Sequence, residues 1–336
     1  MINTQKKPPV LAVVGPTGTG KSELAIALAK ALGNAEIVSM DSMQIYRGLD
    51  IGTAKLTREE MQGVAHHMLD VAEPDSVYTV SDYCRDARNC MDDLLSRGQL
   101  PILTGGTGLY LNALSVEMTM GEEGADPALR ASLKKTAETE EGRAALFKRL
   151  LEIDPESAGK LHPNDVHRVV RAIEIYETTG KRKSEMTPGP EGPYHILVYG
   201  LSMQRDTLYD RLNRRVDRMM DQGWLSEVKR LMDRGIRFDS GDGGVSQAIG
   251  YPELACVLSG TMDMDRALEL IKRNTRRYAK RQWTWFRHDP RVVWFEAEEY
   301  VSRAALQETF LGRVRSDLEQ YLSQTCNIPC PAMGGY

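Results

Sequence analysis

The feature that most constrains the fold of this chain is a glycine-rich segment near its N-terminus, Gly15-Pro-Thr-Gly-Thr-Gly-Lys-Ser22. An apolar run, Val10–Val14, precedes it, and residues with helical spacing follow from Lys21 to Leu32, where Gly33 ends the helix. The pattern G-x-x-x-x-G-K-[ST] between a strand and a helix is typical of a P-loop, whose backbone N–H groups bind phosphate. The segment therefore predicts a phosphate-binding enzyme rather than a chance turn.

Each residue of this P-loop is a candidate ligand of a diphosphate group. Lys21 adds a full positive charge, and the Ser22 hydroxyl is the expected ligand of Mg²⁺, which we expect as the cofactor. Taken alone, the loop predicts a nucleotide site with ATP as its default ligand. The predicted diphosphate-binding residues are Gly15, Pro16, Thr17, Gly18, Thr19, Gly20, Lys21 and Ser22.

Further strands and helices alternate along the first part of the chain. Glu36–Met40 and Leu100–Thr104 have the apolar composition of buried strands. Between them a helix is expected, capped by Ser81, with Tyr83, Ala87, Cys90 and Leu94 on its apolar face. Alternation of this kind predicts an α/β fold: a P-loop NTPase-like parallel sheet with right-handed crossovers, flanked by helices.

The pattern changes after the third strand, because no convincing strand occurs from Glu117 to Pro193. Asp126-Pro127 opens a helix there. The sheet resumes at His195–Tyr199 and Arg291–Phe295, with helices over 206–234 and 265–286 between them. We therefore expect a P-loop core made of residues 1–116 and 196–322, an all-helical insertion at 117–195, and a disordered tail at 323–336.

Composition and charge exclude several classes of protein. The chain has no apolar run long enough to span a membrane, so no membrane partner is expected. Its five cysteines form no Cys-x-x-Cys pair, which suits a cytoplasmic protein, and we expect a monomer. A zinc site at Cys326 and Cys330 is not expected, nor a metal site at His66 and His67, whose side chains face opposite ways in an extended chain.

A carboxylate is missing where an ATPase or GTPase would have one. The third strand runs into Thr104-Gly105-Gly106-Thr107 without Asp or Glu, whereas Asp41 follows the second strand. Carboxyl ends of parallel strands face the ligand crevice, so Asp41 is expected to point at the reacting centre. The alternative is that Asp41 only caps a turn. The arrangement favours group transfer to an acceptor over a motor or switch.

A basic stretch near the C-terminus indicates a polyanionic partner. From Ile271 to Arg287 there is no acidic residue, although the formal net charge of the whole chain is −4. Ile271, Tyr278 and Trp285 recur every seven residues and are expected in the core; the alternative for the charges is a solvated helix face. The basic residues are Lys272, Arg273, Arg276, Arg277, Lys280, Arg281 and Arg287, of which Arg273, Arg277, Lys280 and Arg287 share one face.

Several longer motifs resemble the bacterial-type tRNA dimethylallyltransferases (IPP transferases), and the resemblance covers nearly the whole chain. Besides the P-loop, they are Asp41-Ser-Met-Gln-Ile-Tyr-Arg-Gly-Leu-Asp-Ile-Gly-Thr-Ala-Lys55, His66-His-Met-Leu-Asp70, Gly105-Gly-Thr-Gly-Leu-Tyr110, Ala125-Asp-Pro-Ala-Leu-Arg130, His162-Pro-Asn-Asp165, Gln247-Ala-Ile-Gly-Tyr-Pro-Glu253 and Lys280-Arg-Gln-Trp-Thr-Trp-Phe-Arg287. The resemblance implies transfer of a dimethylallyl group from dimethylallyl diphosphate to N6 of the adenosine 3′-adjacent to the anticodon. The acceptors would be tRNAs that read codons beginning with U.

The resemblance also implies roles for individual residues. Asp41 would take the proton of the adenine amine, and Thr107 would act beside it. Arg215, on a stripe with Arg211 and Arg218 that could equally be solvated, would stabilise the diphosphate leaving group. The residues implied to touch the tRNA anticodon stem-loop or shape its channel are Asp41, Ser42, Met43, Gln44, Thr107, Leu129, His167, Arg168, Val169, Val170, Arg171, Gln247, Ala248, Ile249, Gly250, Tyr251, Pro252, Lys280, Arg281, Gln282, Trp283, Thr284, Trp285, Phe286 and Arg287.

Three other functions compete with this one. A prenyltransferase acting on free AMP or ATP would need neither the insertion nor the basic stretch. A small-molecule P-loop kinase is not excluded by the acid-free third strand, but would bind ATP in competition with dimethylallyl diphosphate. An RNA-binding module without enzymatic activity would have no use for Asp41.

Overall fold

The sheet that carries the P-loop is entirely parallel. The computed structural model describes residues 6–117, 126–186, 190–238 and 244–323, so all but the first residue of the predicted disordered tail lies outside the described residues. The strands of the sheet follow the order β3-β2-β4-β1-β5-β6. They are β1 (Pro9–Val14), β2 (Ala35–Met40), β3 (His66–His67), β4 (Leu100–Gly105), β5 (His195–Ser202) and β6 (Val292–Glu296).

The register of the strands brings their carboxyl ends to one edge. Val14 pairs with Gly105 and with Gly200, and Met40 pairs with Gly105. The loops that follow β1, β2 and β4 therefore leave the sheet side by side. The P-loop follows β1, Asp41 follows β2, and Thr107 lies in the loop after β4, as expected from the sequence.

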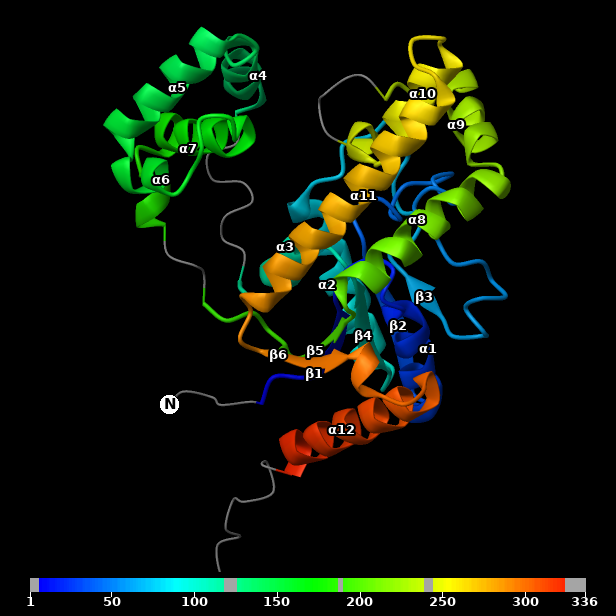
Figure 1. Ribbon diagram of the computed structural model, residues 1–336. Coiled ribbons are helices and arrows are strands. Elements are labelled where there is room, and N and C mark those ends of the chain that lie inside the picture. The colour runs from blue at the N-terminus through cyan, green and yellow to red at the C-terminus, as the bar shows by residue number, and fades with distance from the viewer. Residues whose placement is uncertain (1–5, 118–125, 187–189, 239–243, 324–336) are drawn as a thin grey trace, which may run out of the picture. The chain divides into compact units, whose positions relative to one another are not determined.

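Helices cover both faces of this sheet (Figure 1). Helix α1 (Lys21–Leu32) packs on one face together with α12 (Arg303–Ser323), where Leu28 and Phe310 are fully buried. Helix α2 (Val80–Ser96) covers the other, with Tyr83, Ala87 and Leu94 buried as predicted. Its cap is Thr79, not Ser81, because the Thr79 side chain accepts a hydrogen bond from the Asp82 N–H. Cys90 is only half-buried, and Cys84 and Met91 complete the apolar face.

A second apolar cluster forms from helices late in the chain. The region expected to be helical from Asp206 to Arg234 is divided at Gly223 into α8 (Arg205–Asp221) and α9 (Trp224–Asp233). Trp224 packs edge-on against Tyr251, with ring centroids 5.7 Å apart. Ile45, Tyr46 and Leu49 from the loop after β2 join them. Helices α10 (Tyr251–Leu258) and α11 (Met264–Arg287) and the short turn η2 (Gly244–Gln247) also contribute to this cluster. Outside the cluster lie α3 (Gly108–Leu114) and the short turn η3 (Ala297–Glu299).

The chain divides into two compact units. One combines Met1–Asn112 with Pro193–Tyr336, and the other comprises Ala113–Gly192, whose ends lie three or four residues from the bounds expected for the insertion. The second unit has its own core around Leu150 and Ile173. It contains α4 (Pro127–Thr136), α5 (Glu140–Ile153), α6 (Pro155–Gly159), α7 (Val166–Thr179) and η1 (Lys183–Glu185).

Local sequence signals explain where these insertion helices begin. Asp126 caps α4 by accepting hydrogen bonds from the Ala128 and Leu129 N–H groups, as its position before Pro127 predicted. The fully buried Glu174 carboxylate on α7 is paired with Arg130 and Arg171. A buried carboxylate is tolerated only when it is paired in this way.

Replacing Gly250 by alanine is expected to lower the apparent Tm more than the same change at Gly260. Both glycines have a positive φ, so each alanine costs about 1 to 2 kcal/mol in backbone energy. Only at Gly250 would the new methyl group meet the Trp224 indole, at 2.0 Å, whereas nothing lies within 4 Å at Gly260. Overpacking adds about 1 to 3 kcal/mol. Equal Tm shifts in thermal unfolding would contradict this packing.

Candidate active site

The P-loop is braced by its own side chains. All three of its glycines have a positive φ, and a Cβ on Gly15 would lie 2.3 Å from the Leu201 carbonyl oxygen. The buried Thr19 hydroxyl donates to the Pro16 carbonyl at 3.0 Å, and Lys21 Nζ donates to the same oxygen at 3.3 Å. These contacts within the loop hold the shape of the cradle, with the N-terminus of α1 behind it.

Lys21 carries a positive charge that its surroundings make easy to lose. Burial lowers the pKa of this lysine from 10.5 to about 8; the nearby Asp41 carboxylate acts against the shift, and Arg215 adds to it. A diphosphate in the cradle would raise the pKa again, because an opposite charge favours the ammonium form. The Asp41 carboxylate thus offsets only part of the cost of burying the Lys21 charge in this loop.

Arg215 reaches the same loop from helix α8. Its Nη1 donates to the Thr17 hydroxyl at 2.9 Å, and burial lowers its pKa, while Asp41 acts to raise it. The opposite side of α8 is buried through Leu208, Leu212 and Met219, as predicted. Of the arginine stripe, Arg218 is exposed and Arg211 is half-buried. Arg211 lines a second cavity together with Thr19 and Gly20, whereas Arg215 is hydrogen-bonded to Thr17. The alternative interpretation, in which the arginine stripe is a solvated helix face, therefore does not hold for Arg215.

Asp41 both caps a turn and keeps one oxygen available. Its Oδ1 accepts hydrogen bonds from the N–H groups of Met43 at 2.9 Å and Gln44 at 3.3 Å. Among the described residues, Oδ2 accepts none. The two interpretations of Asp41 are therefore compatible, because turn capping uses one oxygen and leaves the other to act on a ligand.

Thr107 joins the ends of β2 and β4. Its N–H donates to the Met40 carbonyl and its hydroxyl accepts from the Ser42 N–H, both at 3.2 Å. Tyr278 on α11 lies near Asp41, and burial, followed by the Asp41 charge, raises the pKa of its phenol. Tyr278 was expected in the core but faces Asp41, and it is a site residue that sequence reasoning missed.

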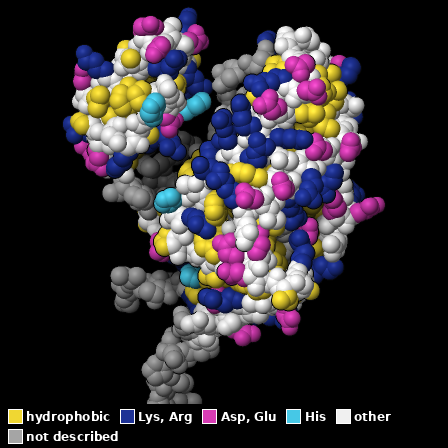
Figure 2. Space-filling view, viewed as in Figure 1, with side chains coloured by type: hydrophobic (Ala, Val, Ile, Leu, Met, Phe, Trp, Pro, Cys, Tyr) yellow, Lys and Arg dark blue, Asp and Glu magenta, His cyan; other side chains and the backbone are white. Residues whose placement is uncertain are grey.

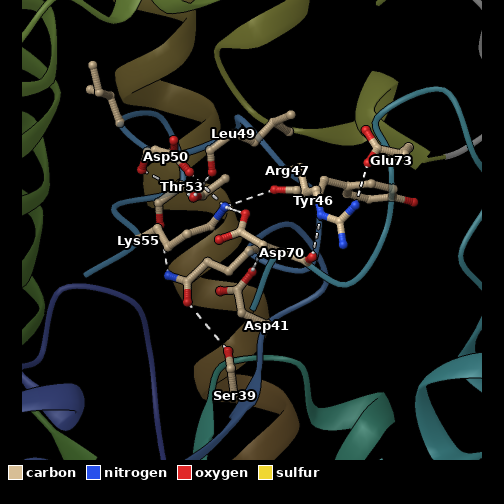
Figure 3. A network of polar contacts seen from close by, with 12 residues as sticks. Ser39, Asp41, Tyr46, Arg47, Leu49, Asp50, Thr53, Lys55, Asp70 and Glu73 are labelled. Atoms are coloured by element: carbon tan, nitrogen blue, oxygen red, sulfur yellow. Dashed lines mark hydrogen bonds and ion pairs between the residues drawn. The ribbon is translucent and has the colours of Figure 1, made fainter. Parts of the chain in front are cut away.

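The loop from Asp41 to Lys55 is held by a polar network (Figure 3). Lys55 points between the carboxylates of Asp50 and Asp70, at 2.8 and 2.6 Å, and also donates to the Tyr46 carbonyl at 2.8 Å. The lysine side chain is 6% exposed, so these pairs replace most of its hydration. The network folds the loop back so that its residues 52 and 53 return to the cavity beside Asp41.

Glu227 anchors the same loop from the other side and was also missed. Its carboxylate accepts from the N–H groups of Asp50, Ile51 and Gly52 at 2.8 to 3.2 Å, and from the Tyr251 hydroxyl at 2.7 Å. It is 2% exposed. An acid among the apolar positions of α9, between Trp224 and Val228, was the available signal.

These elements enclose a cavity of about 300 Å³. Thr17, Asp41 and Arg215 form a polar end, and the remaining wall is mostly apolar. The apolar and aromatic lining residues include Leu212, Val216, Met219, Trp224, Ile249 and Tyr278. A cavity with a cationic phosphate cradle, one carboxylate and an apolar wall suits a substrate that has both a diphosphate and a hydrocarbon part.

The basic helix α11 presents charge to solvent. Lys and Arg side chains gather along this helix in Figure 2, and Arg277, Lys280, Arg281 and Arg287 are exposed. By contrast, Lys272 pairs with Asp217, and Arg276 donates to Asn213 at 2.6 Å, so these two cations brace α11 against α8. Trp285 is 37% exposed rather than in the core, so the prediction for this residue was wrong. Phe286 takes the buried position instead.

The residues predicted to contact RNA fall into two groups. Most are at least partly exposed: Ser42, Met43, Gln44, Leu129, His167, Arg168, Arg171, Gln247, Ile249, Pro252, Lys280, Arg281, Trp283, Thr284, Trp285 and Arg287. The side chains of Ala248, Tyr251, Gln282 and Phe286 are buried, as are Val169 and Val170 in the core of the second unit. Gly250 is buried against Trp224. Of this buried group, Ala248 and Tyr251 line the cavity beside Asp41.

The described part of the chain contains neither a membrane-spanning helix nor a cluster of metal-binding side chains. None of the helices there combines the length and apolarity that a membrane crossing needs. Within the same residues, no three His, Cys, Asp or Glu side chains come together as a metal site would require. His67 instead pairs with Glu36 at 2.6 Å, and His66 Nδ1 lies 2.9 Å from the Val64 carbonyl.

Comparison with known proteins gives one consistent family. The family model described as "IPP transferase" matches residues 44–289. A tRNA dimethylallyltransferase of Oceanobacillus iheyensis is 46% identical over 297 residues, which cover 88% of this chain and 93% of that protein.

Solved structures agree with this result. The tRNA isopentenylpyrophosphate transferase of Bacillus halodurans is 42% identical, with a TM-score of 0.71, and the match covers 95% of this chain and 99% of that one. A eukaryotic dimethylallyltransferase acting on tRNA is 29% identical, with a TM-score of 0.78 and coverage of 94% and 80%. The chain belongs to the IPP transferase family.

Proposed function

We propose that this protein transfers a dimethylallyl group from dimethylallyl diphosphate to N6 of the adenosine 3′-adjacent to the anticodon, in tRNAs that read codons beginning with U. The observation that carries the proposal is that Asp41, with one oxygen available, shares a cavity with Arg215 and the P-loop. The names of the similar proteins support the same reaction. Nothing in the site favours a kinase or an adenylate prenyltransferase.

The P-loop would bind the leaving group of this reaction. Charge develops on the diphosphate as the allylic C–O bond breaks, and Lys21 and Arg215 are placed to stabilise it. Their low hydration strengthens that interaction. Mg²⁺ fits the site only together with diphosphate, because among the described residues Ser22 is accompanied by no acidic cluster. When bound, the ion would neutralise charge on the diphosphate oxygens.

Asp41 would remove the proton from the acceptor. An exocyclic adenine amine becomes acidic only as its nitrogen bonds to the allylic carbon, so the base is needed late in the step. The Oδ2 of Asp41 is available for that proton while Oδ1 remains bound to the turn. Thr107 holds the adjoining backbone at Met40 and Ser42, and the apolar wall would exclude water from the allylic carbon.

The RNA would bind through the exposed cations of α11, and we propose that the helical unit contributes His167, Arg168 and Arg171. An anticodon base must leave its stack to reach a cavity of this kind, and phosphate contacts would hold the loop meanwhile. We further propose that the protein acts as a monomer in the cytosol; Cys84, Cys90 and Cys256 are free thiols in the structure.

Replacement of Asp41 tests the base. We expect Asp41→Asn and Asp41→Ala to reduce single-turnover prenyl transfer about 10²- to 10⁴-fold and to leave tRNA affinity largely unchanged. The asparagine side chain keeps an oxygen that can accept the hydrogen bonds of the turn. A lower rate in Asp41→Asn therefore cannot be explained by a disrupted turn. The measurement is transfer of radiolabel from dimethylallyl diphosphate to unmodified tRNA, followed by nucleoside analysis; wild-type turnover in either variant would refute the role.

The pH dependence of diphosphate binding tests Lys21. Because the pKa of this lysine is about 8 in the free protein, its charge is present at pH 7 and lost as the pH rises above 8. Affinity for inorganic diphosphate should then fall up to about tenfold per pH unit. Lys21→Arg stays charged and should show a shallower decline in calorimetric titrations. The ionisation of diphosphate itself affects the wild-type protein and Lys21→Arg equally. Parallel curves of affinity against pH for the two proteins would therefore contradict the role of Lys21.

Salt dependence tests the RNA surface. If the four exposed cations of α11 contact phosphates, a plot of log affinity against log salt should have a slope of about −3. Lys280→Ala should reduce the magnitude of that slope by about 1. Lys229→Ala is the matched control, because Lys229 is paired with Asp233 on α9. A flat response, or equal effects of both variants, would remove α11 from the interface.

A further inference from the structure

Gln282 lies within the basic helix but points inward. It is 4% exposed, and its neighbour Arg281 is exposed to solvent. Its Oε1 accepts a hydrogen bond from the Thr17 N–H at 2.8 Å, and its Nε2 donates to the Gly106 carbonyl at 3.0 Å. One amide therefore joins the P-loop to the loop after β4, across sequence separations of 265 and 176 residues.

The fit around this amide leaves no room for another arrangement. A Cβ on Gly106 would lie 1.9 Å from Gln282 Nε2, so the close approach depends on glycine. The two partners also fix the orientation of the amide, since a flipped side chain would place NH₂ against an N–H and oxygen against a carbonyl. Both partners are backbone groups, so the contact controls the path of two loops.

These two loops carry the opposite sides of the proposed reaction. Thr17 binds Arg215 through its hydroxyl on the leaving-group side. Gly106 precedes Thr107, which is bonded to Ser42 beside Asp41 on the acceptor side. Gln282 is therefore a direct side-chain connection between the diphosphate cradle and the segment that holds the base.

We propose that Gln282 is a positioning residue that sets the separation between the leaving group and the acceptor amine. The inference rests on the proposed prenyl transfer. In such a displacement the reacting atoms must lie about 3 to 3.5 Å apart and in line, and a misplacement of about 1 Å can cost two orders of magnitude in rate. Because Gln282 projects from the RNA-facing helix, it also ties that surface to the cradle.

The test separates positioning from direct RNA contact. For Gln282→Leu we expect the single-turnover rate, measured with both substrates saturating, to fall about 10- to 100-fold. The Kd for tRNA should stay at the wild-type value. Arg281→Ala is the comparison: its exposed side chain should affect the Kd for tRNA. A weakened tRNA Kd in Gln282→Leu, with a normal rate at saturation, would overturn the proposal, as would an unchanged rate.

Gln282→Glu provides a second readout that does not depend on leucine being tolerated. An ionised carboxylate can still accept from the Thr17 N–H but cannot donate to Gly106, whereas a protonated carboxyl does both. The rate of this variant relative to wild type should therefore recover as the pH is lowered. A constant ratio across pH would show that the donor to Gly106 has no positioning role.

A third measurement separates this inference from the proposed function. Inorganic diphosphate binding without tRNA needs only the cradle, and it should weaken in Gln282→Leu because Thr17 loses its anchor. If wild-type protein modified no tRNA, the proposed function would fail, and this binding would still report on the connection. Wild-type diphosphate affinity in Gln282→Leu would contradict the anchoring of the cradle.

Discussion

The rest of the structure depends on the parallel register that places Val14, Met40 and Gly105 at one edge of the sheet. Three loops leave the sheet together there, and each brings one chemical capacity: a phosphate cradle, a carboxylate and a hydroxyl. Crossover helices carry each chain segment back to the opposite edge, so the next strand again ends here. Thr17 and Asp41 line one cavity as a result, and Thr107 is hydrogen-bonded to Ser42 beside it.

Irregular loops at this edge are held by a few buried polar side chains. Lys55, Glu227 and Gln282 each satisfy backbone groups or carboxylates that have no partner within a helix or strand. An unpaired group of this kind would cost about 1 to 3 kcal/mol when buried. Substituting these residues would therefore affect the shape of the cavity as well as stability.

The charges in the site complement the ligand proposed for it. Lys21 and Arg215 are kept close together with one carboxylate, and burial lowers the pKa of both. Such an arrangement is costly without an anion, and it becomes favourable when diphosphate enters. The exposed cations of α11 are surrounded by solvent, so each would contribute little alone, and the affinity for RNA would depend on how many phosphates they contact. In the proposed function, the two basic regions would bind different phosphates by different physical means.

Short-range signals were enough for much of this protein. The glycine spacing of the P-loop, the apolar runs of the strands and the Asp126-Pro127 cap each depend on contacts within a few residues, so the sequence alone predicted them. Trp285 was misplaced because helical periodicity cannot tell which face a neighbouring element covers. The family resemblance placed Gln282 among the residues that touch the RNA or shape its channel. The real partners of Gln282 lie 265 and 176 residues away, and only the folded sheet brings them to one side chain.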